Sequence, residues 1–328
     1  MVMPTQWLFK KLARLVVVLL SVSALTFLLL NVLPGDVAHV IGGADASAED
    51  IAAIRADLGL DRSLPERYIS WLGSVLGGNL GKSYLTGQPV LEAICARLPV
   101  TIELLILSQI LALAMALPAG MIAAYRNGTA LDRLINAAGF ATLSIPSFVM
   151  ALLFVTVFSI HLRWLPATGY APLSEGLGAN LTALLLPALS IALIEWVVLM
   201  RVLRSDMITT LQQNYILMAR AKGLPPWKVL LHHAFRPSSF TMVTICGLQV
   251  GRLLGEAVIV ETIFALPGVG RLLLQAISTR DYLMVQGCVL LISAGYVTIN
   301  AVIDMAYPLI DPRIRTGQAH GLTAPSPR

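Results

Sequence analysis

Charged residues are scarce in this chain. Asp, Glu, Lys and Arg together make up 12% of its 328 residues, against roughly 25% in a typical soluble domain. A soluble enzyme of this length needs more charge to cover its surface, so that class is all but excluded. Intrinsic disorder is excluded too, because disordered chains are polar and rich in charge. Hydrophobic residues make up 57% of the chain, which indicates an integral membrane protein.

The sequence is also poor in residues that build disulfide, metal and catalytic centres. Its three cysteines, Cys95, Cys246 and Cys288, form no CxxC pair, and we interpret them as small apolar residues. The five histidines are dispersed, and neither HExxH nor GxSxG occurs. We therefore expect no catalytic residue, metal ligand or cofactor in this chain. The basic residues are scattered as well, which argues against a nucleic-acid partner.

One glycine-rich stretch, residues 77–83, resembles a phosphate-binding loop but departs from its pattern. The motif requires a glycine five residues before Gly81, and Leu76 occupies that position. No buried strand precedes the stretch. The chain is therefore expected to lack ATPase activity of its own.

Long apolar runs are the most prominent feature of the sequence. A helix rises 1.5 Å per residue, so about 20 apolar residues cross the hydrocarbon core of a bilayer. Six runs approach or exceed that length: about residues 15–33, 100–125, 134–160, 181–200, 240–260 and 283–310. The first run lacks a small-x-small cleavage site, so it is interpreted as a retained helix rather than a signal peptide. The fold class expected is an all-α membrane protein with six transmembrane helices.

The distribution of Lys and Arg predicts the orientation. With the N-terminus inside, fourteen of the 23 basic residues fall on the inner side and eight on the outer side. Both termini are then cytoplasmic. The chain divides into residues 1–98 (first helix and long extracytoplasmic loop), 99–310 (membrane domain with the inner loop 201–239) and 311–328 (cytoplasmic tail).

Five ionisable residues fall inside the predicted spans, where charge is costly and marks candidate functional positions. They are Glu103, Glu195, Arg252, Glu256 and Asp304. Arg252 and Glu256 are spaced i,i+4, so they share a helix face and can neutralise each other. Two interpretations stay open, a polar translocation path and a structural ion pair between helices.

The fifth span also carries a stripe of small residues, Gly247, Gly251 and Gly255. This GxxxGxxxG spacing lets two helices approach closely. The stripe is assigned to helix packing, either at a subunit interface or within the subunit. Prolines interrupt three spans and predict kinks; they are Pro118, Pro146 and Pro187.

Residues 213–237, in the inner loop, give the strongest local signal. They predict a helix that ends at Gly223, a turn, and a second helix opened by Pro226. The small residues Ala219, Ala221 and Gly223 would let another protein pack closely. The alternative is an amphipathic helix pair on the membrane surface.

Four motifs, in order along the chain, carry a resemblance to the permeases of ABC importers in their dipeptide/oligopeptide form. They are Leu33-Pro34-Gly35-Asp36, Ala219-Arg220-Ala221-Lys222-Gly223-Leu224, the stretch 261–273 followed by Arg280-Asp281-Tyr282, and Asp311-Pro312-Arg313-Ile314-Arg315. The resemblance covers about residues 8–315.

The resemblance implies a type I ABC-importer permease fold in a bacterial inner membrane. It also implies four kinds of partner or ligand: a second homologous permease, two ABC ATPases that bind ATP and Mg²⁺, an extracytoplasmic substrate-binding protein, and a peptide substrate. Residues Ala219 to Leu224 would then form the ATPase-coupling loop.

Other substrates and one other class of transporter stay open. Related permeases carry glutathione or nickel, because selectivity resides largely in the separate binding protein. A proton-coupled secondary transporter would instead use Glu195, Asp304 or Glu256 as a proton relay. A membrane enzyme is disfavoured by the absence of a catalytic cluster.

Overall fold

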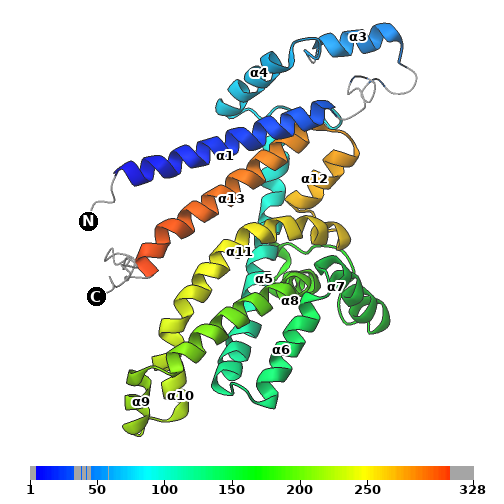
Figure 1. Ribbon diagram of the computed structural model, residues 1–328. Coiled ribbons are helices and arrows are strands. Elements are labelled where there is room, and N and C mark those ends of the chain that lie inside the picture. The colour runs from blue at the N-terminus through cyan, green and yellow to red at the C-terminus, as the bar shows by residue number, and fades with distance from the viewer. Residues whose placement is uncertain (1–4, 33–37, 39–41, 43–45, 58, 311–328) are drawn as a thin grey trace.

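The computed structural model describes residues 5–32, 38, 42, 46–57 and 59–310. Within these ranges the chain is helical, with turns and a single isolated bridge between Lys82 and Pro89. Five of the described helices are long and apolar enough to cross a bilayer. They are α1 (Thr5–Val32), α5 (Val90–Tyr125), α8 (Leu177–Leu211), α11 (Arg236–Ile263) and α13 (Tyr282–Ile310), shown in Figure 1.

The span expected over residues 134–160 is not one straight helix. It is a pair, α6 (Ala130–Leu143) and α7 (Ser147–Phe154), and α7 continues as the π-helical turn η1 (Val155–His161). The two halves meet at an angle of 95°. Pro146 causes the break, because its ring also drives the preceding Ile145 away from helical backbone angles. The kink expected at Pro146 is therefore present as a break that divides the span in two, while Pro118 and Pro187 lie inside the continuous helices α5 and α8.

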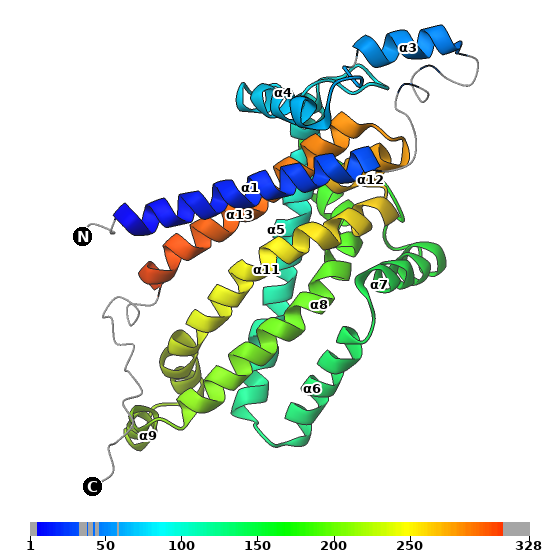
Figure 2. The same ribbon diagram turned by 45° about the horizontal axis from the view of Figure 1, so that its top comes forward.

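Short helices occupy the two ends of the bundle. At one end lie α3 (Ala48–Asp57), α4 (Leu64–Leu76) and α12 (Val269–Ser278). At the other end lie α9 (Asn214–Ala221), the short α10 (Pro226–Lys228) and the π-helical η3 (Val229–Phe235). The single turn η2 (Leu173–Glu175) precedes α8. Figures 1 and 2 show α1 beginning and α13 ending on the side of α9. We call the two ends the α4 end and the α9 end.

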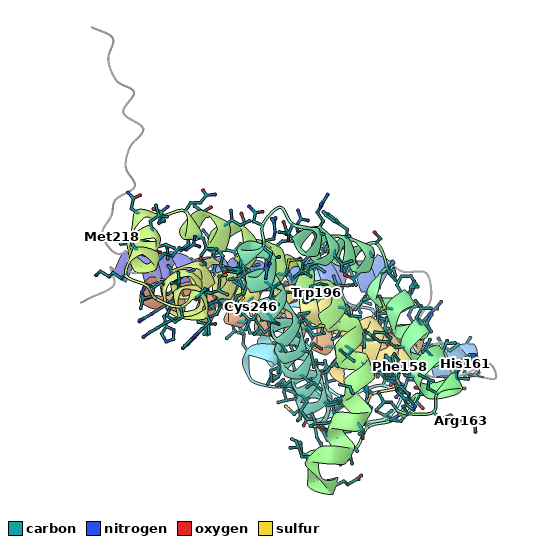
Figure 3. All side chains as sticks on the ribbon, turned by 90° about the horizontal axis from the view of Figure 1, so that it is seen from below. Phe158, His161, Arg163, Trp196, Met218 and Cys246 are labelled. Atoms are coloured by element: carbon teal, nitrogen blue, oxygen red, sulfur yellow. The ribbon has the colours of Figure 1, made fainter. Side chains whose placement is uncertain are left out.

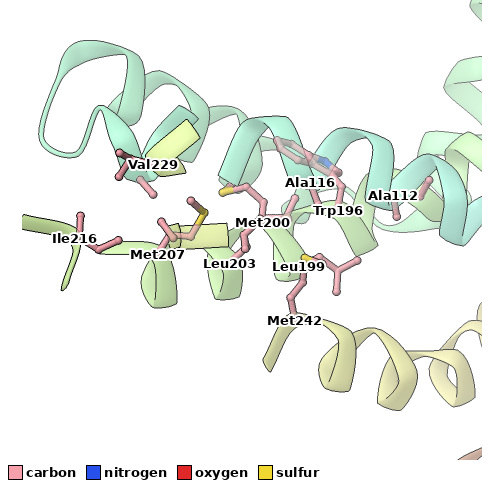
Figure 4. Packing of buried hydrophobic residues seen from close by; sticks show 14 of the residues in the cluster. Ala112, Ala116, Trp196, Leu199, Met200, Leu203, Met207, Ile216, Val229 and Met242 are labelled. Carbon is pink, nitrogen blue, oxygen red and sulfur yellow. The ribbon is translucent and has the colours of Figure 1, made fainter. Parts of the chain in front are cut away.

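The core is built around α5 and α8, which make the most extensive helix contact in the chain. Small residues bring them together: a Cβ added at Gly120 would lie 3.1 Å from the Leu203 side chain and 3.1 Å from the Met200 carbonyl oxygen. Figure 4 shows Ala112 and Ala116 beside Trp196, Met200 and other large residues of α8. The same cluster extends to Ile216 of α9 and Val229 of η3. The segment after α8 is therefore packed onto the helix pair.

Candidate functional site

A charge cluster lies within the spans, formed by Glu195 on α8 and by Arg252 and Glu256 on α11. Nη2 of Arg252 donates to Oε1 of Glu195, and Nε of Arg252 lies 3.9 Å from Oε1 of Glu256. The helices hold this register because Leu253 and Ala257 of α11 are buried in one cluster with Ile191 of α8. The i,i+4 spacing indicates Glu256 as a partner, but the closer carboxylate comes from another helix.

The three side chains differ in exposure. The Glu195 side chain is fully buried, that of Glu256 is 19% exposed, and that of Arg252 is 45% exposed. Each carboxylate keeps one buried oxygen without a hydrogen-bond partner, Oε2 of Glu195 and Oε2 of Glu256. Two carboxylates thus share one guanidinium, and the guanidinium is the part that faces outward. This arrangement fits both open interpretations, since the bond to Glu195 joins α8 to α11 and the Arg252 guanidinium is partly exposed.

Glu103 lies apart from this cluster, toward the α4 end. Its Oε2 accepts hydrogen bonds from the Tyr170 hydroxyl at 2.8 Å and from Nδ2 of Asn180 at 2.9 Å. Burial, followed by the bond to Glu103, raises the pKa of Tyr170 to about 12. Glu103 therefore ties the loop before α8 to α5. The side chain of Asp304 lies outside the part of the chain that the structure describes.

The glycine stripe of α11 faces α13 of the same chain at two positions. A Cβ added at Gly247 would lie 2.9 Å from Ile303, and one at Gly251 would overlap the Tyr296 ring. At Gly255 nothing lies within 4 Å. Packing within the subunit therefore accounts for Gly247 and Gly251, while Gly255 lies beside open space.

The α9 segment ends as the sequence predicts. Gly223 has φ +78°, and its N–H donates to the Arg220 carbonyl at 2.9 Å. The next N–H, of Leu224, donates to the Ala219 carbonyl at 3.3 Å. This pair of bonds is a Schellman C-cap. The motif favours glycine at position 223 because the residue there has left-handed backbone angles.

The outer face of this segment is both apolar and basic. Within the predicted coupling loop, Ala219 is buried and Leu224 half-buried, while Arg220 to Gly223 are exposed. Large apolar side chains also remain exposed; they are Tyr215 (46%), Leu217 (54%), Met218 (63%) and Trp227 (60%). Figure 3 shows Met218 at the edge of the molecule. We call Tyr215, Leu217, Met218 and Trp227, with Arg220, Lys222 and Lys228, the coupling surface.

Sequence reasoning missed a second ion pair, near the α9 end. Arg204 of α8 forms a bidentate salt bridge with Asp132 of α6, and its Nε–Oδ1 and Nη2–Oδ2 distances are both 2.7 Å. Asp132 also accepts from Asn136 and from the Gly128 N–H. A signal existed, because Thr129-x-x-Asp132 is typical of a helix start. The pair fixes the α5–α6 turn against α8.

A buried carboxylate at the α4 end was also missed. Glu261, at the end of α11, is fully buried and accepts from the Thr101 hydroxyl of α5 at 2.6 Å. It also accepts from the Arg271 N–H at 3.0 Å, in the first turn of α12. Negative charge is stabilised at a helix N-terminus. One carboxylate therefore joins α5, α11 and α12.

Two family models together match almost the whole chain. The binding-protein-dependent transport system inner membrane component matches residues 116–316, and the N-terminal membrane component of these systems matches residues 4–105. The chain belongs to this permease family. It is a multi-pass protein of the inner membrane and a subunit of an ABC importer, whose other components include an ATPase and a substrate-binding protein.

Individual relatives agree with the family. This permease is 40% identical over 313 residues to a protein of Brucella melitensis named as a peptide transport system permease, covering 95% of this chain and 99% of the relative. It is 35% identical over 309 residues to a glutathione transport system permease of Escherichia coli, covering 94% and 98%. The methionine ABC transporter MetNI, in an inward-facing conformation, matches with a TM-score of 0.54 at 15% identity, covering 67% of this chain and 96% of that one. That structure supports the fold alone.

Proposed function

We propose that this permease translocates peptides delivered by an extracytoplasmic binding protein. The observation that carries the proposal is the full-length match, at 40% identity, to a protein named as a peptide permease. The charge cluster supports it, because Arg252 exposes a positive charge within the spans and a peptide carries a carboxylate at one end. Glutathione, itself a peptide, is the second candidate, supported by the match at 35% identity.

We further propose that the coupling surface docks on a partner ATPase. Its exposed leucine, methionine and aromatic side chains lie on a segment that is itself buried against α5 and α8 through Ile216 and Val229. A cavity of about 360 Å³ lies behind it, lined by Arg220, Leu224 and Leu230 among others. The ATPases would bind ATP and Mg²⁺, and a second homologous permease would complete the pore. Docking here would pass ATP-driven movement to the helix core.

Reconstitution of the whole importer tests the substrate. Proteoliposomes with the permeases, the ATPases and the binding protein should take up a labelled dipeptide or oligopeptide when ATP is present. Liposomes without the binding protein are the control. Uptake of glutathione or nickel but not of longer peptides would replace the peptide assignment. Uptake by this chain alone, driven by a proton gradient, would place it among secondary transporters.

We predict that the α4 end faces the outside of the cell. Ala53, exposed on α3, should be labelled as cysteine by an impermeant thiol reagent when the outer barrier is opened. The three native cysteines must first be replaced, because Cys95 is exposed. A cysteine at Lys222 is the matched control, and it should react only after lysis of the inner membrane. The opposite labelling order would reverse the topology.

A further inference from the structure

A cavity of about 190 Å³ lies at the α4 end, between α4, the last turns of α1 and the first turns of α13. It shares no lining residue with the charge cluster. Phe27 and Trp71 line its apolar side, and Arg62, Arg67 and Gln286 are among its polar residues. A buried water needs at least roughly 10–15 Å³ of such space, so the cavity accommodates a group larger than one water.

The lining of this cavity is basic. It includes two arginines and no carboxylate. Neither Arg62 nor Arg67 forms an ion pair with a carboxylate in the described part of the chain. The Arg67 guanidinium instead lies 5.8 Å from the centre of the Phe27 ring. The nearby Asp281 is buried and already accepts a hydrogen bond from Ser83. The cavity therefore favours an anion.

Two buried polar groups in the cavity wall lack partners. The indole Nε1 of Trp71 is buried and donates to no acceptor. Gln286 is 5% exposed, and its Oε1 has no partner either. Native proteins pair nearly all buried polar atoms, so an exception needs an explanation. A bound ligand with acceptor oxygens, and a water or hydroxyl beside it, would satisfy both groups.

The surroundings of the cavity are those of a lipid site. α1 exposes apolar side chains on the turns next to it, at Leu25 (59%), Leu28 (49%) and Leu29 (57%). Trp71, Tyr84 and Tyr282 line the cavity, and Trp and Tyr are enriched where a membrane protein meets the headgroup layer. Arginine suits phosphate because its guanidinium forms two parallel hydrogen bonds. Acyl chains along α1 would place a headgroup at the cavity.

We propose that this cavity binds the phosphate of an anionic phospholipid, with Arg67 and the Trp71 indole as its principal donors and the acyl chains against α1. The site shares no residue with the charge cluster and does not depend on which substrate the importer carries. Lipid bound here would tie α4 to α1 and α13.

Native mass spectrometry of the detergent-purified importer, titrated with phosphatidylglycerol or phosphatidylcholine, tests this site. The wild-type importer should retain phosphatidylglycerol preferentially, and Arg67→Gln should weaken that retention roughly tenfold, which corresponds to about 1.4 kcal/mol. Arg55→Gln is the matched control, because Arg55 lies on α3 outside the cavity lining and pairs with Asp61 at 3.8 Å. Trp71→Phe, which keeps a ring but removes the N–H, gives a second test that does not depend on charge.

Three results would overturn the proposal. Equal retention of phosphatidylglycerol by the wild type and by both cavity variants would show that the lipid binds elsewhere. Displacement of the lipid by millimolar inorganic phosphate, with phosphate bound in its place, would assign the site to free phosphate. Displacement by a peptide carboxylate would assign it to substrate.

Discussion

Replacing Arg252 with leucine should destabilise this permease strongly. The change leaves Glu195 as a fully buried carboxylate without its guanidinium. Breaking a buried pair in this way typically costs 3–5 kcal/mol, and the half-exposed position of Arg252 places the expected loss toward ~2–3 kcal/mol. The measurement is the thermal unfolding of the purified importer, together with the amount of folded protein in the membrane.

A double-mutant cycle separates the two possible partners. Arg252→Leu combined with Glu195→Leu should recover part of the lost stability, because no unpaired charge stays buried. The cycle with Glu256 should show weaker coupling, since that carboxylate lies 3.9 Å away and is partly exposed. Arg201→Leu is the matched control: Arg201 lies over the Phe140 ring at 4.9 Å rather than against a carboxylate. Strictly additive losses for Arg252 and Glu195 would refute the pairing. A stable double variant that no longer transports would assign the cluster to the path.

Gly223→Arg should abolish transport while leaving the chain folded. Nothing lies within 4 Å of a Cβ added at Gly223, so the new side chain meets no atom of this subunit. The left-handed backbone costs about 1–2 kcal/mol for a residue with a Cβ, which a large helical core tolerates. If the coupling surface docks on an ATPase, a clash that weakens docking by ~2.7 kcal/mol lowers the affinity about a hundredfold. ATP-driven uptake and co-purification of the ATPase are the readouts.

Gly128 offers a matched control for this experiment. It has φ +80°, lies in the α5–α6 turn near the α9 end, and also has nothing within 4 Å of an added Cβ. Gly128→Arg therefore introduces the same strain and the same charge away from the coupling surface. Uptake should be kept in this variant and lost in Gly223→Arg. Equal losses in both would attribute the effect to backbone strain, and normal uptake by Gly223→Arg would rule out docking at this turn.

The lengths of the apolar runs and the positions of glycine and proline predict much of this fold. Five long helices follow from runs of suitable length, and the end of α9 follows from Gly223. A kink at Pro146 follows from the proline, but its size of 95° does not, because hydropathy carries no direction. The presence of a proline does not by itself predict a break in a helix, because Pro118 and Pro187 lie in continuous helices.

The candidate site was predictable only where its partners are close in sequence. The i,i+4 rule relates Arg252 to Glu256, but Glu195 lies 57 residues away and comes near only when α8 packs on α11. Glu261 is similar: its partners Thr101 and Arg271 belong to two other helices. Pairings of this kind depend on the rotation of each helix about its own axis. One sequence does not fix that rotation.

The close packing of α5 on α8 has a mechanical consequence. Gly120 brings the two backbones together, and Ile216 and Val229 are buried in the same cluster as Ala116 and Leu203. Close-packed protein interiors have low compressibility. If the coupling surface docks on an ATPase, a displacement of α9 would therefore be passed to α5 and α8 with little local deformation. On the same condition, a cavity-creating substitution in this cluster would let the packing deform locally and would weaken the transmission of movement toward Glu195 and Arg252.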